Sequence, residues 1–420
     1  MGEKAASKAR SAHVPWALLC LAALSSACGT DEARGAAAPR TIPGCEMLDL
    51  SLCDTRQREC QTSRLAIAAC LRETEPGALP QVSVMNEQEY VDYWNAQFEG
   101  KQSNKTNHFE VAMTWLGLAQ PGSFGFVPLQ AADVSDWFGT YRWRQEDLLL
   151  IDHGRPADDE ASNVELVGAL VRALRDRDID ISAWSTAVWI IDEDGRWGAD
   201  AMYFGEARLY SNRYKAALEG LDPAAFDEMA SIGDGIREDV AWIRAQPSSY
   251  VASNDRFPDN FGARFAYLAW QRGGAAGIDG LYDTYLLTHQ LMASETEEGP
   301  PPSLKHHDLP VAPAAWESGN VTAIGAWGLF LTLNRSLSSD AAWALSLDWR
   351  GDQVYVFKGV EPTDETALVW QLEMADEAAA TALEAELGSA DPEARIQRDG
   401  SFVTLAKTTN DDSLEWAFTN

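Results

Sequence analysis

The segment that decides the fold is Asn163–Asp178, which reads NVELVGALVRALRDRD. Apolar side chains recur in it at the spacing of one buried helical face, at Val164, Val167, Val171 and Leu174. The neighbouring stripe carries Gly168 and Arg172, four residues apart, which is the spacing at which one helix presents two metal ligands. This segment therefore predicts a buried helix, with Gly168 and Arg172 on the stripe beside its apolar face.

The composition predicts an acidic, folded chain. The sequence has 420 residues, of which 46% are hydrophobic, and its formal net charge is −31. This length is enough to bury a large core in one or two domains. A negative charge of this size argues against nucleic-acid binding, because few cations are available to neutralise phosphates.

The first residues have the pattern of an export signal. Three cations precede the short apolar run Val14–Leu24, and Ser25–Ala27 then lead into Cys28. An apolar run this short suits a signal peptide and not a membrane-spanning helix. Small residues before a cysteine resemble the lipobox of bacterial lipoproteins, with Leu24 one position further upstream than usual. We therefore expect residues 1–27 to be the signal and Cys28 to carry lipid, with conventional cleavage as the alternative.

Four further cysteines support export, because they cluster within 26 residues and none follows them. An even number of clustered cysteines in an exported chain indicates disulfides. Of three possible connectivities, a helical hairpin would favour the nested pairs Cys45–Cys70 and Cys53–Cys60. A four-cysteine zinc site is the alternative, although the paired C-x2-C spacings typical of such sites are absent.

Changes in composition and hydrophobic pattern divide the chain into five parts. We expect a signal at 1–27, a flexible tether at 28–43, a disulfide-bonded helical hairpin and linker at 44–80, a helical core at 81–335 and a C-terminal α+β subdomain at 336–420. Residues 136–152 alternate and then become apolar, which predicts a β-hairpin before the quoted helix. Residues 321–333 are strongly apolar, but this run is short and suits a buried helix. The predicted class is α+β and mainly helical.

Several motifs occur in the order found in a group of exported bacterial zincin-like metallopeptidases, many of them lipoproteins. This chain resembles that family from about Trp115 to Lys407. The shared motifs are Leu116-Gly117-Leu118 with Pro121-Gly122, ALRDRD at Ala173–Asp178, GEARLY at Gly205–Tyr210, Arg272-Gly273-Gly274, ETEE at Glu295–Glu298, Gly351-Asp352 with Tyr355, and Leu368-Val369-Trp370. The resemblance implies a zincin-like core followed by a small C-terminal subdomain that contains strands.

The resemblance also implies that the zinc site is degenerate. It places the family's HExxH motif on Gly168–Arg172, where both histidines and the catalytic glutamate are missing. Gly168 and Ala169 offer neither a ligand nor a base, and Arg172 brings a positive charge. Only Glu206 remains, at the position of the third ligand. We therefore expect no metal, no cofactor and no catalytic residue of the family type, and we expect Arg172 to pair with Glu206. The alternative is that Arg172 faces solvent or pairs locally with Asp176.

Other candidate sites are weaker. His306-His307-Asp308 is the one histidine cluster, and it lies in a proline-rich loop, where an exposed loop is the simpler interpretation. Asp192–Gly195, DEDG, resembles half of a calcium loop but lacks the remaining ligand spacing, so a turn is the simpler interpretation.

Three functions compete. The first is a catalytically inactive pseudopeptidase of the cell envelope, held by its lipid anchor, that binds a peptide or protein in its former cleft. The second is an active metal-dependent hydrolase with an atypical site, and the third is a structural lipoprotein whose cleft is filled. A groove beside residues 168–172 and 206 would distinguish the first from the third.

Overall fold

The computed structural model contains one unit from Arg40 to Asn420. Among the residues that the structure describes, sixteen helical and eight strand elements make the fold α+β in class, as predicted, with helices predominating. The structure describes residues 42–98, 108–123, 129–135, 137–189, 192–221, 228–254, 256–293, 312–319, 322–360, 365–409 and 414–418. The predicted signal, Cys28 and the His306-His307-Asp308 cluster lie outside these residues.

The cysteine segment contains one helix, α1 (Arg58–Leu71), preceded by irregular chain. Both predicted disulfides are present: Cys45–Cys70 closes a separation of 25 residues and Cys53–Cys60 one of 7. The expected helical hairpin is wrong, because turns occupy much of residues 43–57 in place of a first helix. The disulfides hold this irregular arm against α1, which itself packs on the helix that contains the quoted segment.

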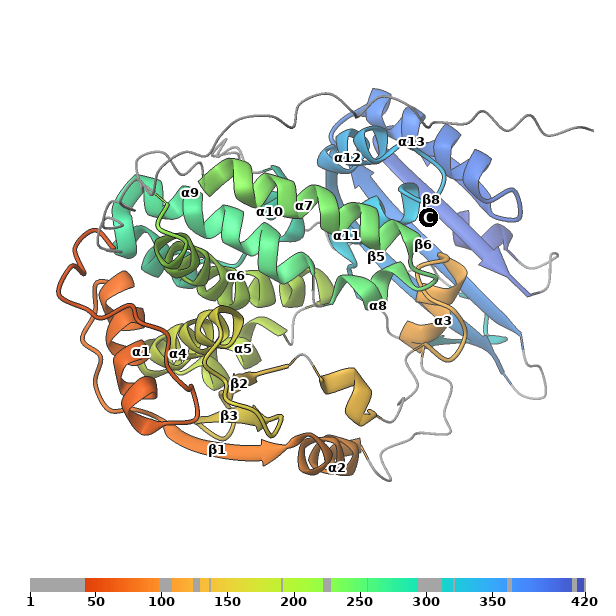
Figure 1. Ribbon diagram of the computed structural model, residues 1–420. Helices are drawn as coiled ribbons and strands as arrows, with labels where there is room; N and C mark the ends of the chain where they lie inside the picture. The colour runs from red at the N-terminus through yellow and green to blue at the C-terminus, as the bar shows by residue number, and fades with distance from the viewer. Residues whose placement is uncertain are drawn as a thin grey trace, which may run out of the picture. The chain divides into compact units, whose positions relative to one another are not determined.

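A three-stranded sheet precedes the helical core (Figure 1). Strand β1 (Gln81–Asn86) lies parallel to β3 (Asp147–Asp152), and β2 (Gly139–Arg142) pairs antiparallel with β3. The β2–β3 pair confirms the predicted hairpin. The strand order is β1-β3-β2, so β2 forms an edge of this sheet among the described residues. Helix α2 (Glu87–Phe98), the one-turn helix η1 (Ala131–Val134) and α3 (His108–Trp115) belong to the surrounding connections.

The core of the unit is built on two long helices. Helix α4 (Glu160–Ile179) contains the quoted segment and packs against α6 (Glu193–Leu218), which crosses α9 (Phe257–Asp279). The crossing is close because a Cβ on Gly205 would lie 2.0 Å from the carbonyl carbon of Gly262. The remaining helices here are α5 (Ile181–Trp189), α7 (Glu228–Ala245), α8 (Ser249–Ser253), η2 (Gly280–Asp283) and α10 (Thr288–Ala293).

Two expectations for this region need correction. The sequence predicts one helix over 278–292, but the chain leaves helical geometry at Thr284 and re-enters it only at α10. The DEDG segment is neither a turn nor a calcium loop. Asp192 caps the N-terminus of α6 by accepting a hydrogen bond from the Gly195 backbone N–H at 2.6 Å, and the next three residues begin the helix.

The C-terminal part is a five-stranded antiparallel sheet in the order β4-β5-β6-β8-β7. Residues 336–420 contain both strands and helices, as the sequence predicts. The elements are β4 (Trp316–Gly319), α11 (Gly325–Leu333), α12 (Ser339–Leu347), β5 (Trp349–Gly359), β6 (Thr366–Met374), α13 (Glu377–Ala390), β7 (Arg395–Asp399), β8 (Phe402–Thr408) and η4 (Glu415–Phe418). Strand β4 precedes residue 336, so the sheet begins earlier than the predicted subdomain. The apolar run at 321–333 is the buried helix α11, as expected.

Asp352 joins two of the motifs on which the resemblance depends. Its carboxylate accepts hydrogen bonds from the indole N–H of Trp349 and of Trp370 and from the backbone N–H of Ile324 and Gly325. The GD motif on β5 is therefore bonded directly to the LVW motif on β6 and to the start of α11. Within the described residues, no helix is both long enough and apolar enough to cross a membrane.

Candidate functional site

The quoted helix is anchored at its start and tightly packed at its centre. Asp159 caps α4 by accepting a hydrogen bond from the Ser162 backbone N–H at 2.8 Å. At Gly168 the helix comes so close to α6 that an added Cβ would lie 2.6 Å from Ser211 Oγ. A side chain at position 168 would therefore displace Ser211, so glycine at this position permits the close approach of α4 and α6.

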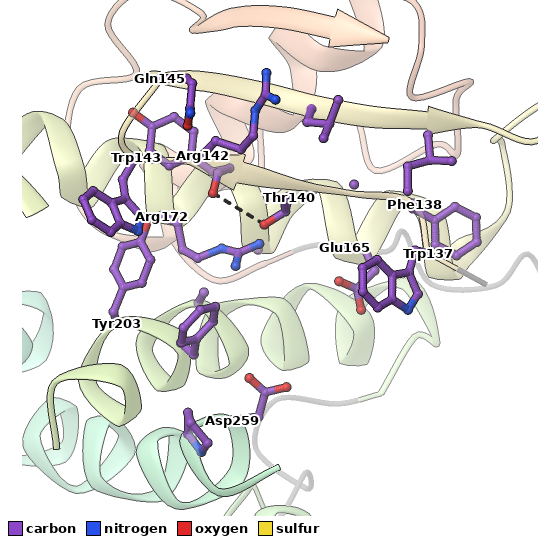
Figure 2. A pocket seen from close by; sticks show the side chains of 18 of the residues that line it. Trp137, Phe138, Thr140, Arg142, Trp143, Gln145, Glu165, Arg172, Tyr203 and Asp259 are labelled. Carbon is purple, nitrogen blue, oxygen red and sulfur yellow. Dashed lines mark hydrogen bonds between the residues drawn. The ribbon is translucent and has the colours of Figure 1, made fainter. Parts of the chain in front are cut away.

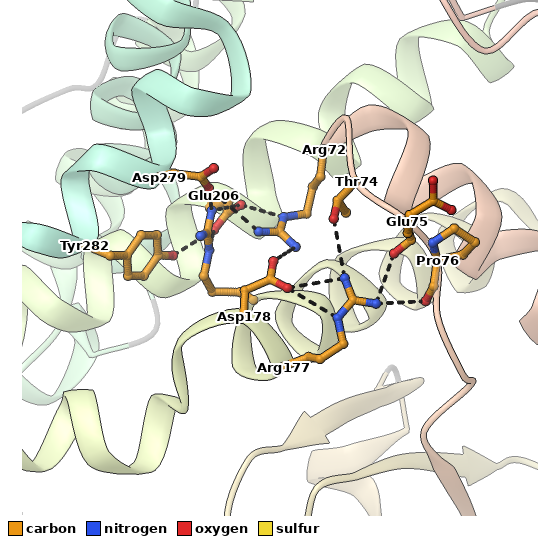
Figure 3. A network of polar contacts seen from close by, with 10 residues as sticks. Arg72, Thr74, Glu75, Pro76, Arg177, Asp178, Glu206, Asp279 and Tyr282 are labelled. Atoms are coloured by element: carbon orange, nitrogen blue, oxygen red, sulfur yellow. Dashed lines mark hydrogen bonds and ion pairs between the residues drawn. The ribbon is translucent and has the colours of Figure 1, made fainter.

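Glu206 is the centre of a buried ion-pair network (Figure 3). Its carboxylate is 1% exposed and accepts hydrogen bonds from Arg175 Nε and Nη2, each at 2.8 Å, and from Arg72 Nε at 2.9 Å. The Tyr282 hydroxyl donates a further bond to it at 2.8 Å. Asp279 accepts a bond from the same Arg175 guanidinium at 2.7 Å. The network ties together the end of α1, α4, α6 and η2.

The charges in this network keep Glu206 ionised. Burial alone would raise the pKa of its carboxyl. The charge and hydrogen bonds of Arg175, then the charge of Arg72 and the hydrogen bond from Tyr282, lower the pKa below its ordinary value. Both arginines are themselves buried, and their side chains are only 3% exposed. Arg175 and Glu206 thus connect α4 to α6 through a buried ion pair, to which Arg72 adds a second cation.

The expected Arg172–Glu206 pair is wrong, because Glu206 binds Arg175 and Arg72 instead. Arg172 lies over the ring of Phe204, 5.3 Å from its centroid. Phe204 and Glu206 are two residues apart, about 200° around a helix, so they point to nearly opposite sides of α6. Arg172 can therefore face one of them but not both. The alternative local pair with Asp176 is not formed either, since Asp176 accepts from the Tyr141 hydroxyl and the Ile181 backbone N–H.

A cavity of about 780 Å³ opens on the side of α4 to which Arg172 points (Figure 2). Strands β2 and β3 and the residues on either side of β2 form one wall, and residues of α2, α4, α6 and the start of α9, with Asn254, form the rest. Aromatic side chains dominate the lining: Tyr90, Tyr93, Trp94, Trp137, Phe138, Tyr141, Trp143, Tyr203 and Phe204. Gly168 and Arg172 line the cavity, whereas Ala169 and Glu206 do not.

The charged groups of the cavity include two arginines, Arg172 and Arg208. Within the described chain, neither Arg172 nor Arg208 has a hydrogen bond or an ion pair, and the Nε atoms of both are buried. Glu165 and Asp259 bring negative charge to the same lining. Burial raises the pKa of Asp259 to about 6, and the nearby charges of Arg208 and Arg172 oppose that shift.

The residues at the positions where the resemblance would place a metal do not fit zinc. Gly168 has no ligand atom, Arg172 repels a cation, and all the close partners of Glu206 are donors already bonded to it. Among the described residues, no group of three histidine, cysteine or carboxylate side chains is placed to hold a metal ion. The four clustered cysteines are all in disulfides, which removes the alternative four-cysteine zinc site.

The sequence identified the cavity only through Gly168 and Arg172. Arg175 lies within the quoted segment, but nothing in the pattern distinguishes it from Arg172 or Arg177. Arg208 lies in the GEARLY motif, but the resemblance assigns no function to it. The aromatic lining comes from segments scattered between residues 90 and 204.

No protein-family model matches this chain, and comparisons with curated proteins and with solved structures find no match.

Proposed function

We propose that this protein is a catalytically inactive, zincin-like pseudopeptidase that binds an extended peptide segment in the cavity beside α4. The observation that carries the proposal is that an aromatic-lined cavity of about 780 Å³ is present beside Gly168 and Arg172. Pockets for small ligands commonly enclose about 300–1,000 Å³. A purely structural protein with a filled cleft would have no such space.

A peptide suits this cavity because one wall is a sheet edge. Residues Gly139–Arg142 of β2 line the cavity, and β2 is the last strand on that side of the sheet in the part of the chain that the structure describes. An edge strand offers backbone donors and acceptors to a further strand, and neighbouring pockets select its side chains. The aromatic rings opposite β2 would supply those pockets with large apolar contact area.

Binding without hydrolysis follows from the groups that remain. Peptide hydrolysis by a zincin needs a metal to polarise the carbonyl group and a carboxylate base to activate water. Residues 168, 169 and 172 supply a hydrogen, a methyl group and a guanidinium in those places. Glu206 bridges two arginines on another side of α6, away from the cavity.

We also propose that the protein acts at the bacterial cell envelope, anchored through lipid on Cys28. The support is the sequence pattern around Cys28, together with the two disulfides, which are typical of exported proteins. The test is mass spectrometry of the mature N-terminus together with detergent phase partitioning. Cys28→Ser should abolish a lipid adduct and move the protein to the aqueous phase. An unmodified N-terminus in the unaltered protein would contradict the anchor.

The binding function is tested on the full-length protein. A mixture of random octapeptides is incubated with it, and bound peptides and any cleavage products are identified by mass spectrometry. Metal content is measured on protein purified without chelator. We expect retained peptides, intact chains and less than stoichiometric zinc; stoichiometric zinc with cleaved peptides would overturn the proposal.

Two exposed tryptophans provide a matched pair of variants. Trp137 is 47% exposed and lines the cavity, whereas Trp242 is 43% exposed on α7, away from it. Trp137→Ala should weaken peptide retention about tenfold or more, because aromatic anchors dominate binding energy. Trp242→Ala should leave it unchanged. Equal effects of the two variants would place the binding surface elsewhere.

A further inference from the structure

The cavity contains two arginines, Arg172 and Arg208, that form no hydrogen bond or ion pair with the described residues. The chain has 64 acidic and 33 basic side chains, so carboxylates are plentiful. Other half-buried arginines form ion pairs with carboxylates: Arg56 pairs with Asp54, Arg142 with Asp147 and Arg213 with Glu228. Arg172 and Arg208 have no such pair among the described residues, although both are half-buried. Leaving two guanidinium groups unpaired costs free energy unless a ligand pairs with them.

Arg172 is held in a position from which it can meet a ligand. Its guanidinium lies over Phe204 on α6 and extends into the space beneath β2 (Figure 2). Tyr203 is beside it, 5% exposed, and the Tyr203 hydroxyl has no hydrogen-bond partner in the described part of the chain. Stacking on one ring leaves the edge of a guanidinium free, and that edge matches the two oxygens of a carboxylate.

The two carboxylates of the lining do not neutralise these arginines. Glu165 and Asp259 border the same space (Figure 2), yet neither has an oxygen within 4.0 Å of a nitrogen of Arg172 or Arg208. Asp259 is close enough to interact electrostatically with both arginines. It therefore balances part of their charge at a distance while leaving their hydrogen-bonding edges open.

We infer that Arg172 and Arg208 bind a carboxylate of the peptide ligand, either its C-terminal carboxylate or an aspartate or glutamate side chain. This inference rests on the proposed function and names the chemistry of its ligand. The cation that took the place of a metal-binding histidine would thus serve recognition, with the aromatic lining holding the residues that flank the bound carboxylate.

The test compares three pools of random octapeptides on the full-length protein. One pool has free C-termini and no internal acidic residues, one has the same composition with amidated C-termini, and one is amidated but contains aspartate and glutamate. We expect a carboxylate-bearing pool to be retained at least tenfold more strongly than the uncharged amidated pool, as for a charge-assisted hydrogen bond. Which of the two is retained identifies the source of the carboxylate.

Variants assign the effect to the two arginines. Arg172→Met and Arg208→Met should each remove most of that preference, while Arg237→Met, which removes an exposed arginine of α7, should preserve it. Asp259→Asn should increase retention because it removes a competing negative charge. Melting temperatures confirm that each variant is folded.

The outcomes separate this inference from the proposed function. Retention of all three pools to the same extent, with no loss in Arg172→Met, would overturn carboxylate binding but leave peptide binding intact. Retention of no pool would overturn both. A carboxylate preference that survives in both arginine variants would place the anion site elsewhere and refute the inference.

Discussion

Replacing Glu206 with glutamine would keep the shape of the side chain and remove the negative charge that Arg72 and Arg175 share. All three side chains are at least 97% buried, so solvent would compensate little of the loss. Breaking a buried ion pair by removing one partner costs about 3–5 kcal/mol. Asp178 and Asp279 would still pair with the two arginines, so we expect the lower end, about 3 kcal/mol.

The assay is thermal unfolding of the purified protein at pH 7. For a unit of this size a loss of 1 kcal/mol corresponds to about 2 °C, so the melting temperature of Glu206→Gln should fall by about 6 °C. Arg175→Met should show a similar fall. Arg172→Met is the matched control from the same helix, and its melting temperature should change by about 1 °C or less, since Arg172 makes no hydrogen bond within the described chain.

The pH dependence provides a second measurement on the same variant. The pKa of Glu206 is lowered by folding, so its stabilisation is present above its ordinary value of 4.5 and is lost as pH falls through the folded pKa. The difference between the unaltered protein and Glu206→Gln should therefore be constant from pH 6 to 8 and shrink in acid. The reasoning would be refuted by an equal loss in Arg172→Met, or by no loss in Glu206→Gln.

Three further predictions concern stability. Burial raises the pKa of Asp194 to about 8 and that of Asp200 to about 7, so above pH 5 the folded protein binds more protons than the unfolded chain. The melting temperature should therefore fall by several degrees from pH 5 to 8, and Asp194→Asn should flatten this profile. Replacing Cys45 and Cys70 with serine should lower the free energy of unfolding by about 3 kcal/mol, because the disulfide closes a loop of 25 residues. Calorimetry, with the oxidised protein as reference, measures this loss. An unchanged transition would show that the disulfide contributes nothing to stability. Gly205→Ala should lower the free energy of unfolding, measured by denaturant titration, by roughly 3 kcal/mol because its Cβ meets the α9 backbone. Gly233→Ala, where only an Arg237 side-chain atom lies within 4 Å, should be neutral or stabilising. Equal effects of the two variants would contradict the close crossing of α6 and α9.

The local sequence pattern was enough to predict those elements whose hydrophobic or cysteine spacing lies within one short segment. The period of 3.6 in residues 163–178 predicted α4, and the alternation at 136–152 predicted the β2–β3 hairpin. Clustered cysteines, with a preference for nested pairing, predicted both disulfides, although the helical partner expected for α1 did not form. The resemblance led to the prediction, without any coordinates, that Gly168, Ala169 and Arg172 supply no zinc ligand.

Only the tertiary structure decided which charged groups meet. Arg172, Arg175 and Arg177 have the same chemistry and lie within six residues, and the choice among them for Glu206 depends on how α4 and α6 are rotated against each other. Arg72 reaches that carboxylate from a segment 134 residues earlier, positioned by a disulfide-bonded arm. The cavity likewise forms only when a sheet edge and several helices from distant parts of the sequence pack around the same space. Helical periodicity is encoded by neighbouring residues, whereas helix rotation and ion-pair choice are set by the packing of the whole core, which no single segment specifies.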